Sequence, residues 1–323
     1  MLMQRARGSR PMLVLILLYG VVLACALQKF LVLASEWNPK QTPASMPTME
    51  RASPEVSQQE VPGREISESQ EVKPIETCVP ERYVIGCGGD RTEAARRWAN
   101  TVKWRADNNI DGILEEPQPH FDGCKRVFPT YLYGRGKGGH PVLWERIGKV
   151  DVPHLDEMQV PPAVLPRHYV FLFECIFRVV LDPEEDANND AQFITVEDVQ
   201  GISLRHLTPR VLGVVRSLTG VVKDHYVERC HKSYIINAPA LFTLVWRIIS
   251  PLLDPRTKAK IVILGTDHSK MREEIPLSEM PAEYGGTCTR AMDDSDAERR
   301  IRAVVDRANA TNPPGHVSGP PTC

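Results

Sequence analysis

Residues 228–265 constrain the fold of this chain more than any other segment, because they place two buried strands on either side of one apolar helix. Residues 233–237 and 260–264 are short apolar runs bounded by turn residues, a pattern typical of strands buried on both faces of a parallel sheet. Residues 240–249 begin after a proline, end before a Ser-Pro pair and carry one charge, Arg247. A helix that is apolar on almost every face is normally covered on both sides. This helix is therefore predicted to be buried under another layer or to line an apolar cavity.

The same alternation of short apolar runs and helical stretches extends upstream. Strands are predicted at residues 141–146 and 191–199, and helices at residues 167–181 and 207–225. Strands separated by helices imply a mainly parallel sheet with right-handed crossovers, which is an α/β fold.

Composition excludes several classes of function. The chain has 323 residues, 25% of them charged, and a formal net charge of −2, so it has no overall basic field for a nucleic-acid partner. It has no GxSxG, HExxH or cysteine-histidine signature, and we expect no catalytic residues. The eight cysteines lack a CxxC pair and are interpreted as free thiols.

Three local patterns are interpreted as structural. The glycine-rich residues 134–139 lead into a strand rather than a helix, which predicts a hairpin and not a phosphate loop. Residues 182–190 are acidic but lack the spacing of a calcium loop. His225, Cys230 and His231 lack a second pair of zinc ligands, so no metal is expected there.

The N-terminal part predicts attachment to a membrane. Residues 12–34 are apolar over about the length that spans a bilayer, and we expect a single-pass anchor. The alternative is a cleaved secretory signal, because an Ala-Cys-Ala site at residues 24–26 follows a basic start; the protein would then be secretory or lumenal. The organelle and the side of the membrane stay open.

Composition divides the chain into six segments. Residues 35–76 are rich in Pro, Ser and Glu and predict a disordered linker, while residues 92–108 have helical spacing. The segments are a basic N-terminus (1–11), the anchor or signal (12–34), the linker (35–76), a partial helical region (77–118), the α/β domain (119–290), and a C-terminal helix with a disordered tail (291–323).

Several ordered motifs resemble one known family. The runs YIINAP at 234–239, LLDPRTKAKIVILG at 252–265 and MPAEYGG at 280–286 are similar to the CRAL-TRIO lipid-binding domain, in its phosphatidylinositol/phosphatidylcholine transfer branch. The upstream segments 128–131, 140–145 and 194–203 extend the resemblance. It implies a CRAL-TRIO fold, in which crossover helices and a mainly parallel sheet enclose a lipid cavity, preceded here by the short helical region. It also implies a non-enzymatic protein that carries a bound lipid and no cofactor.

The resemblance assigns a lipid headgroup site to Glu228, Thr257 and Lys260. A carboxylate accepts hydrogen bonds from inositol hydroxyls, while a hydroxyl and an ammonium donate to phosphate. The alternative is that these are ordinary surface groups. A basic residue that the family adds from a preceding helix aligns near Cys87, and Arg82 or Arg91 is the candidate substitute.

The resemblance supports phosphatidylcholine less well than phosphatidylinositol. Two tyrosines of the family align with Leu132 and Leu143, and a serine aligns with Phe193, so only Thr195 remains as a possible contact for a second ligand. We therefore expect a second ligand other than phosphatidylcholine, whose identity stays open.

The apolar crossover corresponds, by the same resemblance, to a gating helix at residues 242–253. Its cavity or gate residues are expected to be Phe242, Val245, Trp246, Ile249, Leu252 and Leu253; the alternative for each is plain core packing. The sequence thus predicts a phosphoinositide-binding or lipid-transfer module that is tethered to a membrane. We expect a monomer whose partners are membrane lipids and the membrane surface, and the identity of any protein partner stays open. The alternative is a membrane-anchored sensor for a sterol, tocopherol or retinoid that recruits a protein partner.

Overall fold

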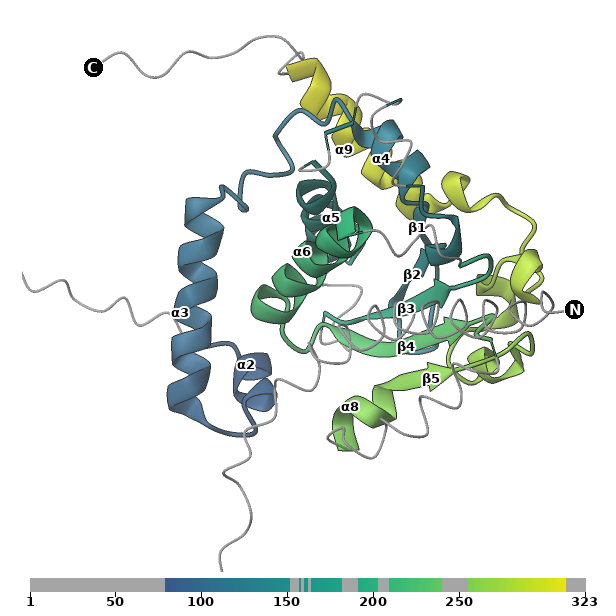
Figure 1. Cartoon of the computed structure of the whole chain (residues 1–323), viewed down its shortest axis with the longest axis horizontal. Coiled ribbons are helices and arrows are strands. Elements are labelled where there is room, and N and C mark those ends of the chain that lie inside the picture. Colours follow the sequence, from purple (N-terminus) through teal and green to yellow (C-terminus); the bar gives the residue numbers. More distant parts are fainter. Residues whose placement is uncertain are drawn as a thin grey trace, which may run out of the picture.

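The computed structural model describes residues 79–151, 157, 160–161, 164–181, 191–202, 209–239 and 255–311. At its centre is a five-stranded sheet in the order β1-β2-β3-β4-β5 (Figure 1). β1 and β2 are antiparallel, and the remaining neighbours are parallel, which confirms the predicted mainly parallel sheet. The strands are β1 (Thr130–Arg135), β2 (Pro141–Glu145), β3 (Phe193–Asp198), β4 (Cys230–Ile236) and β5 (Ile261–Ile263).

The glycine-rich loop joins β1 to β2 as a hairpin, as predicted, and does not lead into a helix. Gly134 shows why a glycine is needed next to this turn. Its φ is 71°, and a β carbon there would lie 2.0 Å from the carbonyl oxygen of Glu279. A side chain at this position would therefore push the segment after β5 off the sheet.

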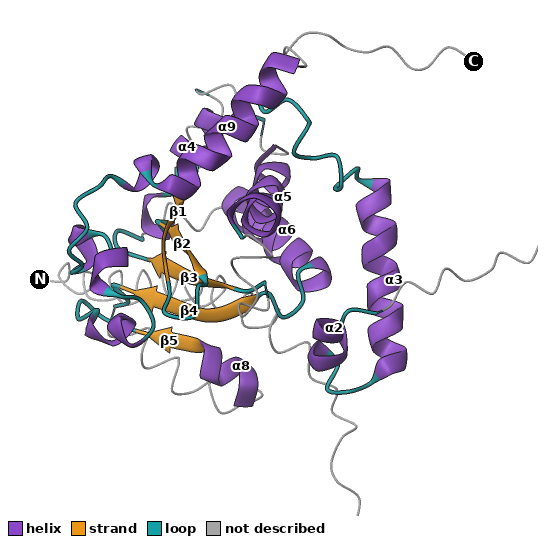
Figure 2. Cartoon of the chain, turned by 180° about the vertical axis from the view of Figure 1, so that it is seen from behind, coloured by secondary structure: helices purple, strands orange, loops and turns teal. Residues whose placement is uncertain are grey.

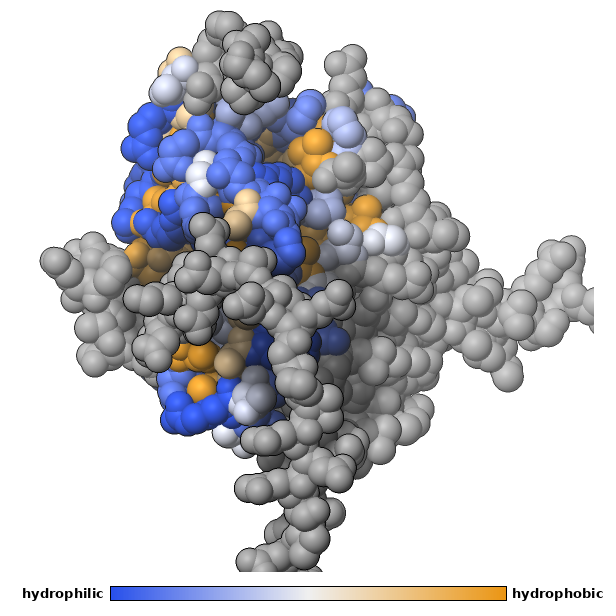
Figure 3. Space-filling view, turned by 90° about the vertical axis from the view of Figure 1, so that its left-hand side faces the viewer, coloured by the Kyte–Doolittle hydropathy of each residue, from blue (hydrophilic) through white to orange (hydrophobic). Residues whose placement is uncertain are grey.

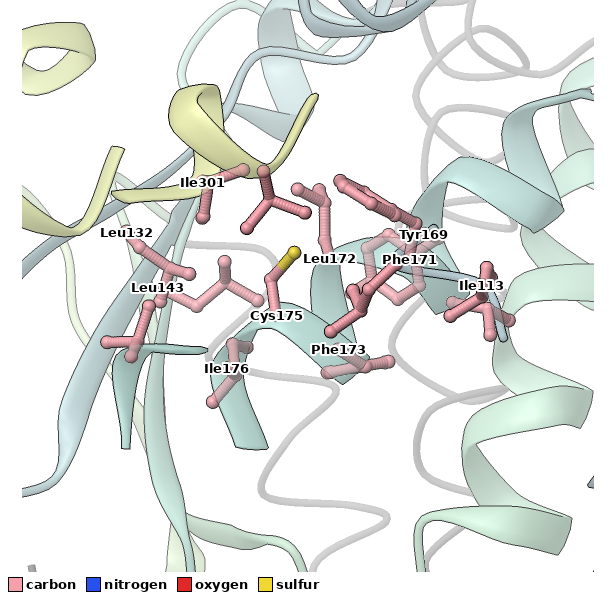
Figure 4. Close-up of a cluster of buried hydrophobic side chains, with 14 of the residues drawn as sticks. Ile113, Leu132, Leu143, Tyr169, Phe171, Leu172, Phe173, Cys175, Ile176 and Ile301 are labelled. Carbon is pink, nitrogen blue, oxygen red and sulfur yellow. The ribbon is translucent and has the colours of Figure 1, made fainter. Parts of the chain in front are cut away.

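Helices cover one face of the sheet. α5 (Val164–Cys175) continues into a π-helical turn, η3 (Ile176–Val180), and connects β2 to β3, while α6 (Pro209–His225) connects β3 to β4. α5 and α6 lie together on the same side (Figure 2). Figure 4 shows the core that results, in which α5 side chains meet Leu132 and Leu143 from the sheet and Ile301 from the C-terminal helix. Alternate strand residues face opposite sides of a sheet, so this core uses only half of each strand.

The other face packs against the segment that follows β5. Trp144, Ile194 and Tyr234 are buried there with Met271 and Met280. This segment consists of short helical turns: η6 (Ser269–Glu273), η7 (Leu277–Glu279), η8 (Ala282–Tyr284) and η9 (Met292–Asp294). Both faces of the central strands are therefore covered, as their continuous apolar runs predict.

The N-terminal helices form a separate layer at the side of the helical face (Figure 1). α2 (Glu81–Gly86) is short, as the glycines at its C-terminal end predict. α3 (Arg91–Asp107) agrees with the predicted helix at 92–108 within one residue. Asp90 caps α3 by accepting a hydrogen bond from the Glu93 amide at 2.9 Å. Figure 3, which views this side, shows hydrophilic side chains over most of the described surface, with small apolar areas among them.

Two ion pairs, one buried and one partly buried, join the outer helices to the domain. Lys125 on α4 (Phe121–Val127) donates to both carboxylate oxygens of Glu298 on α9 (Asp296–Thr311) at 2.8 Å. Arg105 on α3 donates to both oxygens of Glu174 on α5, at 2.9 and 3.0 Å. Tyr226 also donates to Glu174, at 2.8 Å. α9 thus belongs to the core, although its composition predicted only a charged helix before a tail.

In the part of the chain that the structure describes, no helix is both long and apolar enough to cross a membrane. The proposed anchor or signal at residues 12–34 and the linker at 35–76 lie outside that part.

Candidate functional site

The predicted headgroup residues Glu228 and Lys260 meet at one edge of the sheet. Glu228 comes two positions before β4, and Lys260 ends α8 (Pro255–Lys260) directly before β5. Because β4 and β5 are parallel neighbours, the residues that precede them lie at the same edge. The Lys260 ammonium donates to the Glu228 carboxylate, and the two side chains are 22% and 14% exposed. The pair is thus largely, but not fully, shielded from solvent.

The backbone around Glu228 holds the carboxylate in a defined place. Glu228 has a φ of 55°, in the left-handed region that a non-glycine residue rarely adopts. Its carbonyl oxygen accepts a hydrogen bond from the Gln192 side chain at 2.9 Å, and the next carbonyl, of Arg229, accepts from the Phe193 amide at 3.0 Å. These contacts join the start of β4 to the start of β3. Strain of this kind persists only where the surroundings impose it, and it frequently marks functional sites.

Thr257, the third predicted headgroup residue, belongs to α8, but its side chain lies outside the described part of the structure. It precedes Lys260 by three positions in the same helix. The assignment of Thr257 stays a prediction.

Helix α2 of the N-terminal layer packs beside this site. α2 packs against the turn before β4: Tyr83 donates to the carbonyl oxygen of His225 at 3.1 Å. A β carbon on Gly86 would lie 2.5 Å from a methyl carbon of Val227 and 3.7 Å from Cγ of Glu228. Glycine therefore permits α2 to lie directly against the headgroup residue.

Two arginines, Arg82 on α2 and Arg229 just before β4, lie among the residues around this site. The guanidinium carbon of Arg82 on α2 lies 5.1 Å from the centre of the Tyr83 ring. The guanidinium carbon of Arg229 lies 4.4 Å from the centre of the Phe177 ring. Burial, and next the nearby Arg82 charge, lower the pKa of Arg229 to about 10. Arg91, the other candidate substitute, is exposed at the start of α3. The substitution of the family's basic residue by Arg82 or Arg91 stays a prediction.

Sequence reasoning missed Arg229, although it follows Glu228 directly. Arg229 lies just before β4, and its guanidinium donates to the carbonyl oxygen of Ala191 at 2.9 Å. The Sγ atom of Cys87, near which the family's basic residue aligns, accepts a hydrogen bond from the Arg97 guanidinium at 3.9 Å. Another guanidinium therefore lies near that position.

Three of the four residues considered for a second ligand, Leu132, Leu143 and Thr195, lie in one row across the helical face of the sheet. Leu132 pairs with Leu143, Leu143 with Thr195, and Thr195 with Ser233. Thr195 and Ser233 are buried, and both donate to the Glu197 carboxylate, at 3.4 and 3.2 Å. Half of the row is therefore apolar and half is polar, and Thr195 stands at the boundary.

The proposed gate residues, Phe242, Val245, Trp246, Ile249, Leu252 and Leu253, lie outside the described residues. The neighbouring part of the sheet is described. Ile235, Ile261 and Ile263 form an apolar area on β4 and β5 with Val199 and Ala238.

The alternatives that involve metal or disulfide chemistry find no support in the described ranges. No three His, Cys, Asp or Glu side chains gather there in a way that suits a metal ion. His225 stacks on Trp104 with ring centres 3.9 Å apart, whereas His231 stacks on His140, so the two histidines do not face a common point. Five cysteines are described, and none of them is in a disulfide: Cys87, Cys124, Cys175, Cys230 and Cys288.

Comparison with known proteins places this geometry in context. Residues 125–286, about half of the chain, match the model of the family described as "CRAL/TRIO domain". The phosphatidylinositol/phosphatidylcholine transfer protein SFH4 of Arabidopsis thaliana is 34% identical over 213 residues, which cover 64% of this chain and 35% of the relative. The SEC14 cytosolic factor of Eremothecium gossypii is 31% identical over 204 residues, which cover 61% and 65%.

The chain therefore spans about a third of the length of SFH4. Among solved structures, the crystal structure of Sfh5 aligns with a TM-score of 0.48 and 17% identity, over 69% of this chain and 78% of that one.

Proposed function

Because this chain belongs to the CRAL/TRIO domain family, we propose that it is a non-enzymatic lipid-binding and transfer module that loads phosphatidylinositol. The observation that carries the proposal is the meeting of Glu228 and Lys260, which the sequence separates by 32 positions. A carboxylate beside an ammonium presents an acceptor for inositol hydroxyls and a donor for the phosphodiester. The names of SFH4 and other relatives as phosphatidylinositol/phosphatidylcholine transfer proteins support this choice of lipid.

The test is loading from labelled vesicles. The full chain is incubated with phosphatidylcholine vesicles that contain labelled phosphatidylinositol, and the label bound to re-isolated protein is counted. We expect wild-type protein to load the lipid and the double variant Glu228→Ala/Lys260→Ala to lose loading while its circular dichroism spectrum is unchanged. Wild-type loading by the double variant would show that the headgroup lies elsewhere.

The choice of second ligand follows from the mixed row on the sheet. Leu132 and Leu143 offer no hydrogen bond to a choline phosphate, which supports a less polar ligand than phosphatidylcholine. This also supports the second candidate function, a membrane-anchored sensor of a sterol, tocopherol or retinoid that recruits a protein partner. Mass spectrometry of lipid that co-purifies with the chain separates them: phosphatidylinositol supports the transfer module, and a lipophilic small molecule alone supports the sensor.

Tethering to a membrane is the remaining part of the proposal. If residues 12–34 stay attached, the proline-rich linker lets the domain search one membrane at high local concentration. N-terminal sequencing of the mature protein tests this. A mature chain that begins at Leu27 would mean that a signal is removed, and the protein would be secretory or lumenal.

A further inference from the structure

Two carboxylates lie side by side within the sheet. Glu145 on β2 pairs in register with Glu197 on β3, and the two residues are 1% and 7% exposed. Neighbouring strands are about 4.8 Å apart, so like charges at paired positions repel each other. Burial strengthens this repulsion, because the interior screens charges less than water does. Two carboxylates in this arrangement favour a cation between them.

Hydroxyl groups adjoin both carboxylates on the helical face of the sheet. Tyr169 on α5 donates to Glu145 at 2.7 Å, which places this carboxylate on the side of the helices. Thr195 and Ser233, in the neighbouring row of the same face, donate to Glu197 at 3.4 and 3.2 Å. Carboxylate oxygens only accept hydrogen bonds, and hydroxyl oxygens accept them as well as donate. A ligand that fits this cluster therefore has to donate hydrogen bonds.

Thr130 adds an unsatisfied polar atom to the same row. It pairs with Glu145 from the β1 side, so that three polar residues follow one another across the sheet: Thr130, Glu145 and Glu197. Thr130 is fully buried, and among the residues that the structure describes its hydroxyl oxygen has no hydrogen-bond partner. Buried polar side chains nearly always have a partner. A ligand with several N–H donors at Glu145 provides one for Thr130 as well.

The row continues as apolar surface towards the β5 edge of the sheet. Glu197 pairs with Ile235, and Ile235 pairs with Ile263. Ile261 and Ile263 are only partly buried, whereas Glu145 is almost completely enclosed. An apolar chain that lies over these isoleucines would bring its polar end to Glu197. The row therefore matches a lipid whose polar group lies inside and whose chain points towards β5.

We propose that Glu145 and Glu197 bind the protonated primary amine of a second lipid, one with an apolar chain and no phosphate, such as a sphingoid base. The inference rests on the proposed function, because it assigns the second ligand of the same module. A phosphate is disfavoured, since the carboxylates repel it and neighbouring Leu132 and Leu143 offer no donor. A protonated primary amine donates up to three hydrogen bonds, and such charge-assisted bonds are about twice as strong as neutral ones.

The experiment measures the loading of matched lipids by the full chain. Phosphatidylcholine vesicles contain either labelled sphingosine or its labelled N,N,N-trimethyl derivative at the same mole fraction. Both lipids are cations, but only sphingosine donates hydrogen bonds from its nitrogen. We expect wild type to load sphingosine about ten-fold better than the trimethyl derivative. We expect Glu197→Gln, which keeps the size and removes the charge, to reduce this preference to about two-fold or less. Equal loading of the two lipids by wild type, or a full preference in Glu197→Gln, overturns the inference.

The matched control is Asp198→Asn. Asp198 is the next residue on β3, is similarly buried and faces the other side of the sheet, where Tyr284 donates to it at 2.9 Å. This variant also removes a buried charge from β3, and we expect it to keep the wild-type preference. If it loses the preference as fully as Glu197→Gln does, the effect comes from damage to the sheet and the inference fails. Should Glu197→Gln not fold, Glu145→Gln replaces it with the same expected loss.

Two further lipids distinguish other hydrogen-bond donors. Labelled phosphatidylethanolamine carries the same primary amine next to a phosphate, and labelled cholesterol carries a hydroxyl without a charge. We expect wild type to load sphingosine ahead of both. Equal loading of phosphatidylethanolamine would overturn the exclusion of a phosphate, and better loading of cholesterol would overturn the assignment of an amine.

Labelled phosphatidylinositol, measured in parallel, tests the proposed function separately. Glu197 lies near the end of β3, whereas Glu228 and Lys260 precede β4 and β5. We therefore expect Glu197→Gln to load phosphatidylinositol within about two-fold of wild type. Normal loading of phosphatidylinositol without a preference for sphingosine refutes this inference alone. A preference for sphingosine that depends on Glu197, without loading of phosphatidylinositol, supports the amine site and refutes the proposed choice of phosphatidylinositol.

Discussion

Glu228 and Lys260 form an ion pair across the starts of two neighbouring parallel strands, β4 and β5. If this pair binds a lipid headgroup as proposed, it has a consequence for ligand choice, because each group satisfies the other while no headgroup is bound. A bound phosphatidylinositol would weaken the ion pair between Glu228 and Lys260. It would have to replace that contact with hydrogen bonds from the ring hydroxyls to the carboxylate and from the ammonium to the phosphate. Lipids that lack ring hydroxyls cannot make this exchange on the Glu228 side.

Replacing Glu228 by glutamine therefore separates the two roles. Glu228→Gln removes the charge but keeps the size, so Lys260 is left free to bind phosphate. We expect phosphatidylinositol loading to fall several-fold, because hydrogen bonds to a charged acceptor are worth about 1.5–3 kcal/mol, and phosphatidic acid loading to stay equal or rise. The measurement is vesicle loading of both lipids. A rise in phosphatidylinositol loading would mean that Glu228 only neutralises Lys260.

The buried contact between Arg105 and Glu174 is expected to hold the N-terminal helices on the domain. The Glu174 side chain is 3% exposed and accepts from Arg105 and Tyr226. Arg105→Met leaves this carboxylate without its main partner, and loss of one member of a buried pair costs about 3–5 kcal/mol. Urea denaturation of the variant measures the loss. The exposed pair of Arg96 and Glu93 is the control, where Arg96→Met should cost less than about 1 kcal/mol.

Adding Glu174→Leu to Arg105→Met completes this test. The double variant removes both charges, so we expect it to be more stable than Arg105→Met alone. A double variant that loses the sum of the two single effects would show that the two side chains act independently, and the docking role of the pair would be wrong.

The strands and the headgroup pair could be predicted from sequence for different reasons. The sequence predicts strand β4 because a short apolar run between turn residues is typical of a buried strand. The pairing of Glu228 with Lys260 came from the resemblance and not from the pattern of residues, since nothing in their spacing shows that they meet. The parallel pairing of β4 with β5 is what brings them together.

The neighbouring arginine cluster could not be predicted, because it depends on how two distant segments pack. Arg82 is carried on α2, and Gly86 lets this helix lie close to Val227 and Glu228 before β4. Similarly, the charged sequence of α9 hides three apolar side chains that enter the core, Ile301, Val304 and Val305. A helix with so many charges is assigned to the surface until its partner, the buried Lys125, is known.

Acid is expected to destabilise the domain through His168. This side chain is buried, and neither ring nitrogen has a hydrogen-bond partner. Burial, and to a smaller extent the Lys125 charge, lower the pKa of His168 to about 3. A folded-state pKa below the unfolded value of about 6.5 means that the contribution to stability is complete above pH 6.5 and is lost as pH falls towards 3. At pH 5 the loss amounts to about 2 kcal/mol.

The variant His168→Leu tests this assignment. Urea denaturation at pH 7.5 and pH 5 gives the change in unfolding free energy for each protein, and we expect the change to be smaller by about 2 kcal/mol in the variant. His225, whose pKa burial lowers to about 4, supplies part of the remaining dependence. If the unfolding free energy changes between pH 7.5 and pH 5 by the same amount in the variant as in wild type, His168 takes up a proton equally well in the folded and the unfolded chain.

The gate is tested at Trp246, which the sequence places in an apolar helix between β4 and β5. If this helix opens at a membrane, the side chain at this position has to enter hydrocarbon during lipid exchange. A carboxylate resists that transfer strongly. We therefore expect Trp246→Asp to reduce the rate of lipid exchange between vesicles to near background, and to cost less than about 1 kcal/mol of unfolding free energy in the absence of vesicles.

Plain core packing makes the opposite prediction, because a buried tryptophan replaced by aspartate leaves a cavity and an unpaired charge, which cost several kcal/mol. The matched control is Val102→Asp, at an apolar position on α3 that is 38% exposed, where neither exchange nor stability should change much. If Trp246→Asp unfolds the domain while Val102→Asp does not, the helix is part of the core. If both variants exchange lipid at the wild-type rate, residue 246 does not enter the membrane and the gating role fails.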